Sequence, residues 1–167
     1  MSERSDRQRQ EHPIGEGLIT ALAVGGFLII LGLTIALTPD ISNKVSTFFG
    51  DLKSISYPLG GSGSTVNFPA PANPAMHDAF YNAVMNFALG IGILQIVILA
   101  LRLTIRSPLR RIAETVGNLI FWLGAAVLVD VFLIAGTLSG WFQFWSALII
   151  VIGASLIARF LVFLAKK

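Results

Sequence analysis

One carboxylate, Asp130, stands in the middle of the apolar run AAVLVDVFLIAG at residues 125–136. A second set of polar residues, Asp78, Asn82 and Asn86, repeats every four positions, which predicts one polar line along a helix face. An acid inside a membrane helix is a candidate functional site, because an ionised carboxylate is costly to keep in hydrocarbon. Groups of these types could relay ions or protons, or they could form a hydrogen bond between two helices.

The apolar runs define the elements that position these side chains. Four stretches reach the roughly 20 residues that cross a bilayer, namely 15–37, 79–103, 114–138 and 142–164. The chain is 54% hydrophobic and 13% charged, with a mean hydropathy of +0.77, whereas soluble domains carry about 25% charged residues. We therefore expect an all-α integral membrane protein, folded as a four-transmembrane-helix bundle.

The domain plan follows from these spans. Residues 1–14 form a basic tail, and residues 15–167 form a single membrane domain. The first span is longer than the apolar region of about 7–15 residues in a signal peptide, so we interpret it as an uncleaved anchor. Each span carries small residues, such as Ala21, Gly25 and Gly32 in the first, and in lipid these allow close helix packing.

The connection 38–78 contains a helical pattern followed by a stretch rich in Gly, Ser and Pro. Apolar residues recur at helical spacing in the order Ile41, Val45, Phe48 or Phe49, and Leu52. This spacing predicts a short amphipathic helix over 40–53 in the first outer loop. The rest of the loop is expected to be extended and irregular, serving as a spacer or as a surface held by a partner.

Lys and Arg are distributed unevenly between the connections. The N-terminal tail holds three, the segment 102–111 holds four and the C-terminal end holds Arg159, Lys166 and Lys167, whereas the long 38–78 connection holds only two. Basic loops remain in the cytoplasm. The pattern predicts a multi-pass protein of the cell membrane with both termini cytoplasmic.

Two connections carry further signals. In RLTIRSPLRR (102–111), Ser107 is expected to cap the third span, and Arg110 to pair with Glu114. The arginines of this loop are candidate contacts for anionic headgroups or a cytoplasmic partner, or they act only as topological anchors: Arg102, Arg106, Arg110 and Arg111. In TLSGWFQFW (137–145), Ser139 and Gly140 are expected to turn the chain, and the aromatic residues to form an interfacial belt.

The depth of Asp130 limits its possible partners. A third span ending near residue 138 places Asp130 about eight residues, or roughly 12 Å, inside the outer end. Arg159 then lies more than about 10 Å away in depth, too far for an ion pair, and is expected to reach the cytoplasmic headgroups. Asn86 lies within about one turn of the level of Asp130. Three roles for Asp130 remain open: a hydrogen bond to Asn86, an ion or proton path, and contact with another subunit.

The remaining residue types favour a protein without catalytic activity. The chain has no Cys, and its two histidines, His12 and His77, fall on opposite sides of the predicted membrane, so no metal or haem ligand set is visible. We expect no cofactor, no enzymatic activity and no nucleic-acid partner. The sequence predicts a structural, accessory or scaffold subunit in contact with lipids and with other subunits or its own copies. The alternative is a small oligomeric ion- or proton-conducting channel or transporter that uses Asp130.

Overall fold

Four long helices dominate the structure. The computed structural model describes residues 2–58, 63 and 65–165, and its long helices are α1 (Ser2–Leu37), α3 (Asp78–Thr104), α4 (Leu109–Leu128) and α5 (Leu138–Leu164). Four helical segments are long and apolar enough to cross a membrane: Gly15–Leu37, Pro74–Thr104, Leu109–Leu133 and Leu138–Leu164. The number and approximate position of the long apolar helices expected from the sequence are therefore confirmed.

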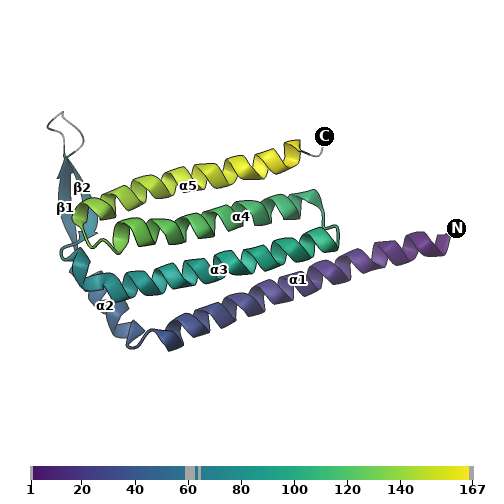
Figure 1. Cartoon of the computed structure of the whole chain (residues 1–167), viewed down its shortest axis with the longest axis horizontal. Coiled ribbons are helices and arrows are strands. Elements are labelled where there is room, and N and C mark those ends of the chain that lie inside the picture. The colour runs from purple at the N-terminus through teal and green to yellow at the C-terminus, as the bar shows by residue number, and fades with distance from the viewer. Residues whose placement is uncertain (1, 59–62, 64, 166–167) are drawn as a thin grey trace.

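The long helices lie side by side in the order α1, α3, α4, α5, and we call this arrangement the four-helix row (Figure 1). Of the most apolar stretch of each span, 6% is buried in α1 and in α5, against 22% in the α3 span and 28% in the α4 span. The two outer helices are thus edges that pack mainly on one neighbour each. The expected bundle is an open layer rather than a closed ring of helices.

The N-terminus of α1, the α3–α4 connection and the end of α5 lie at one end of the row, the basic end (Figure 1). The opposite end, the loop end, carries α2 (Ile41–Asp51), β1 (Leu52–Pro58), β2 (Thr65–Pro71) and a short 3-10 helix, Pro74–His77. The basic segments of the sequence are therefore gathered at one end of the molecule, as their distribution predicted.

The irregular stretch expected after α2 is in fact a β-hairpin. Strands β1 and β2 pair antiparallel, with Ile55 opposite Phe68 and Tyr57 opposite Val66. Tyr57 stacks on Phe142 of α5 at a ring-centroid distance of 4.0 Å, so the hairpin is held by aromatic contact as well as by its ladder. The expectation of an irregular loop was wrong because Gly, Ser and Pro are typical of loops. They also occur at the tip of a hairpin and, for Pro, in edge strands, so composition alone does not distinguish the two.

The core lies at the loop end, where α2, the hairpin, α3 and α5 meet. It is built from seven buried residues: Phe48, Ala70, Tyr81, Val129, Leu133, Trp141 and Phe144. Phe48 stacks on Phe80 at 4.6 Å, and the Trp141 Nε1 donates to the Pro69 carbonyl at 3.1 Å. Most of the aromatic residues expected to form an interfacial belt thus pack against the protein's own loop.

The α4–α5 turn falls earlier than expected. After Leu128 the helix continues as a π-helical segment, Val129–Leu133, and Gly136 then turns the chain with a φ of 64°. Thr137 caps α5 by accepting from the Gly140 N–H at 3.0 Å. Ser139 and Gly140 therefore belong to the first turn of α5, not to the connection. Gly136 is required because only a residue without Cβ fits against Ala75 at this φ.

The α3–α4 turn also differs from its prediction. Pro108 occupies the N-cap position of α4 without a side-chain cap, and Ser107 keeps its hydroxyl buried and without a partner. Arg106 ends the preceding helix in the left-handed region, at a φ of 54°. The expected capping by Ser107 is thus wrong, whereas the Arg110–Glu114 pair is confirmed at 3.1 Å.

Glycines determine which helix faces meet. A Cβ added to Gly26 would lie 2.7 Å from Leu94, and one added to Gly90 would lie 2.8 Å from Ile30, so both glycines admit the α1–α3 contact. By contrast, a Cβ added to Gly25 or Gly32 meets nothing within 4 Å. The face with Gly25 and Gly32, which the sequence left open to packing inside the bundle or against another subunit, meets no neighbour in the described part of the chain.

Candidate functional site

Asp130 lies on the π-helical segment, and its side chain is exposed. The helix ends only three residues later, at Leu133, so Asp130 lies roughly 5 Å from its end rather than the 12 Å that the sequence suggested. The Leu109–Leu133 span is about 37 Å long, which exceeds a hydrocarbon core of about 30 Å. Asp130 thus lies in the last turn of this long apolar segment rather than in its middle.

The polar line of α3 does not lead to Asp130. Asp78 is exposed, and Asn82 donates back to the Asp78 carbonyl at 2.9 Å within the same helix. Asn86 is exposed and lines a cavity of about 390 Å³ between α1 and α3, whose lining includes no α4 residue. In the part of the chain that the structure describes, no hydrogen bond joins Asn86 to Asp130. The structure therefore separates the two groups that the sequence placed together.

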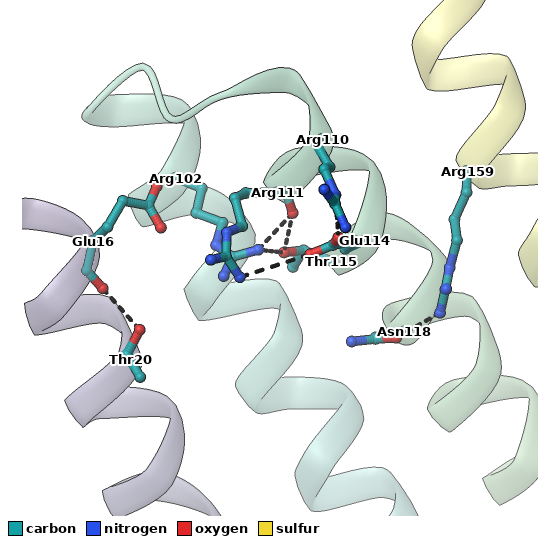
Figure 2. A network of polar contacts seen from close by, with 9 residues as sticks. All are labelled: Glu16, Thr20, Arg102, Arg110, Arg111, Glu114, Thr115, Asn118 and Arg159. Carbon is teal, nitrogen blue, oxygen red and sulfur yellow. Dashed lines mark hydrogen bonds and ion pairs between the residues drawn. The ribbon is translucent and has the colours of Figure 1, made fainter. Parts of the chain in front are cut away.

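The candidate headgroup arginines have different environments at the basic end (Figure 2). Arg102 of α3 turns towards α4 and donates to the Arg111 carbonyl and the Thr115 hydroxyl. Arg106 is exposed, and Arg110 and Arg111 are exposed beside Glu114. Arg102 is therefore a contact between helices, which leaves the other three arginines accessible to headgroups or a partner.

A second arginine contact joins α4 and α5 (Figure 2). Arg159 donates to the Asn118 Oδ1 at 2.8 Å, and its side chain lies over Gly117. The side chain is half-buried, with its Nε buried and without a hydrogen-bond partner. The expectation that Arg159 would reach the headgroups is wrong, because a neighbouring amide and a glycine provide a place for it between the helices.

Unpartnered polar atoms are concentrated at the basic end. Among the described residues, buried side-chain atoms without a partner there are the Glu16 Oε1, the Arg102 Nε, the Ser107 Oγ and the Arg159 Nε. Figure 2 draws Glu16 of α1 and Arg102 of α3 at this same end, and among the described residues they form no ion pair. Polar residues of all four long helices thus gather at this end.

A separate polar cluster holds the loop end together. The Asp51 Oδ2 accepts from the Asn73 N–H at 2.8 Å and lies 3.0 Å from the His77 Nε2. The hydrogen bond with His77, followed by that from Asn73, lowers the pKa of Asp51 below its ordinary value. His77 is 4% exposed and packs edge-on against Phe48, so Asp51 fixes the junction where the hairpin leads into α3.

The polar side chains described above make contacts between neighbouring helices. Within the described ranges, no group of three or more His, Asp or Glu side chains is placed to hold a metal ion. The Arg159–Asn118 contact was missed because the sequence reasoning weighed Arg159 only as a partner of Asp130 or of the headgroups, and Asn118 was not considered.

No protein-family model, curated protein or solved structure matches the chain. The residues themselves are therefore the basis for inferring a function.

Proposed function

We propose that the protein is a non-catalytic structural or accessory subunit of a membrane assembly. The observation that carries this proposal is the free glycine face of α1, composed of Gly17, Gly25 and Gly32. A Cβ built on any of the three meets nothing within 4 Å, whereas one built on Gly26, Gly90 or Gly92 would lie under 3 Å from a side chain of a neighbouring helix. In lipid, small residues of this kind let a second helix approach closely, and the position of α1 at the edge leaves room for one.

The use of polar side chains supports the same function. Arg102 of α3 and Arg159 of α5 each donate a hydrogen bond to α4, and the Asn82 amide is bonded within α3. Contacts of this kind hold helices in register. A conducting pathway would instead need polar groups facing a shared hydrated space. Asp130, exposed near the membrane edge, is suited to contact with a headgroup or with a polar group of a partner.

The experiment compares two adjacent glycines in the full-length protein. Gly25→Ile should reduce chemical crosslinking to a partner, whether a second copy or another subunit, and should leave the thermal unfolding of the chain unchanged. Gly26→Ile should lower the unfolding temperature, because its side chain meets Leu94. Val24→Ile, at an exposed position of the same helix, serves as control. Crosslinking that is unchanged in Gly25→Ile would overturn the proposal.

A conducting protein is the alternative, and the π-helical segment at Asp130 favours it, since such segments recur at functional sites. Flux of protons or monovalent ions into liposomes distinguishes the two functions. Under our proposal the purified protein adds no flux, and Asp130→Asn behaves like the parent. A pH-dependent flux lost in Asp130→Asn would support conduction instead.

We also propose that the basic end faces the cytoplasm, on the strength of its Lys and Arg content. Because the chain has no Cys, single cysteines report on each end separately. Ser54→Cys on β1 and Thr104→Cys at the end of α3 replace exposed residues. An impermeant thiol reagent added to intact cells should label only Ser54→Cys. Labelling of Thr104→Cys alone would reverse the orientation.

A further inference from the structure

A polar cavity and an apolar groove adjoin each other where α2 crosses the ends of α1 and α3 (Figure 1). The cavity, of about 220 Å³, is lined by Asp40, Asn43, Lys44, Thr47, His77 and Phe80, among others. The groove, of about 190 Å³, is lined by apolar groups that include Leu31, Ile35, Ala83 and Val84, and it shares Phe80 with the cavity. The polar cavity and the apolar groove are therefore neighbours on either side of Phe80.

The order of the two compartments matches the depth profile of a bilayer. Lys44 lies beyond the last residue of α1, and His77 lies before the first residue of α3, so the polar cavity is at the ends of these two helices. Leu31 is six residues inside the end of α1 and Phe87 nine residues inside α3, so the groove descends roughly 9–13 Å into the spans. Thr34 presents no free hydroxyl to it, because that group donates to the Ile30 carbonyl.

The charges of the cavity select the kind of headgroup. Asp40 offers a carboxylate, and Lys44 an ammonium with donors left after its one bond to the Pro39 carbonyl. Neither side chain is in a salt bridge within the described residues. The Asp40 carboxylate would repel an anionic headgroup, and the Lys44 ammonium would repel a cationic headgroup. A zwitterionic headgroup satisfies both, with its phosphate near Lys44 and its ammonium near Asp40.

We propose that this site, formed by α1, α2 and α3, binds one zwitterionic phospholipid, with its headgroup in the polar cavity and an acyl chain in the groove. The site rests on the chain spanning a membrane and not on the subunit function proposed above. It is distinct from the arginines of the basic end, which lie at the opposite end of the row.

The test uses the full-length protein extracted from liposomes containing equal amounts of phosphatidylethanolamine and phosphatidylglycerol. Native mass spectrometry should find one retained phosphatidylethanolamine per chain. Asp40→Asn and Lys44→Met should each lower that retention about tenfold, as expected for the loss of one charge-assisted contact. Asparagine is chosen at Asp40 because the residue has a φ of 59°, which asparagine tolerates. Lys53→Met, at an exposed position on β1, is the matched control and should retain lipid like the parent.

The groove is tested separately. Val84→Trp fills it and should also reduce retention, whereas Ile93→Trp, at an exposed position on the same helix outside the groove, should not. Equal retention of both lipids by the parent, or unchanged retention in Lys44→Met and Val84→Trp, would overturn the proposal. A change of oligomeric state in Val84→Trp without loss of lipid would assign the groove to a second copy of the chain and would also overturn it.

Discussion

The Arg159 side chain of α5 lies directly over Gly117 of α4, in space that any larger residue at position 117 would occupy. A Cβ added to Gly117 would overlap the Arg159 Nε and lie 2.8 Å from its Cδ. The next residue, Asn118, accepts the hydrogen bond from the same guanidinium. One glycine and one amide together allow a cation to lie between two apolar helices.

Gly117→Ala should therefore destabilise the protein. The methyl group forces Arg159 away from Asn118, and overpacking of this kind costs about 1–3 kcal/mol. The unfolding transition in detergent, followed by circular dichroism, measures the effect. Gly32→Ala is the matched control, because a Cβ at Gly32 meets nothing within 4 Å. Equal stability of the two variants would contradict the contact.

Replacement of the amide gives an independent measure of the same contact. Asn118→Leu should lower the free energy of unfolding by about 0.6–2 kcal/mol, the range for hydrogen bonds between membrane helices. The chain offers Asn86→Leu as control, since Asn86 is exposed on α3 and faces the cavity beside α1. A larger loss in Asn86→Leu would show that the α3 amide is the more important one.

Phe48 and Phe49 are adjacent in α2 but have opposite environments, with exposed fractions of 7% and 63%. Phe48→Ala should lower the free energy of unfolding by about 3 kcal/mol, because it leaves a cavity among Phe80, Tyr81 and Trp141. Phe49→Ala should have little effect. Chemical denaturation of both variants is the measurement, and a reversed order would mean that α2 is rotated about its axis.

Acid should weaken the loop end through Asp51. Because the pKa of Asp51 is lowered by folding, the folded state binds the proton less readily than the unfolded state. In the unfolded state the pKa of Asp51 is near 3.8. The stabilising effect of Asp51 is complete above that value and is lost as the pH falls through the folded pKa. Unfolding temperatures measured from pH 6 down to pH 2.5 should therefore fall less steeply for Asp51→Asn than for the parent. Asp78→Asn is the control and should follow the parent curve, because the Asp78 carboxylate accepts from the Ala79 N–H and is not part of the Asp51 cluster.

Apolar runs determined what could be predicted from this sequence. The four spans were predictable because each run exceeds the length needed to cross hydrocarbon, and the Arg110–Glu114 pair because helical spacing alone brings it together. The depth of Asp130 was mispredicted because its helix ends at Leu133, before the turn at Gly136 that the apolar run conceals. The Asp51–His77 pair joins residues 26 positions apart, and no local pattern reveals it.

The four-helix row also has a consequence for how the protein is made. Each span after the first packs on the span inserted before it: α3 on α1, α4 on α3, and α5 on α4. Each helix of the row after α1 therefore has one packing neighbour that is already synthesised. The row can thus be assembled in the order of translation, each new span completing a contact as it leaves the ribosome, and α5 is the last to join.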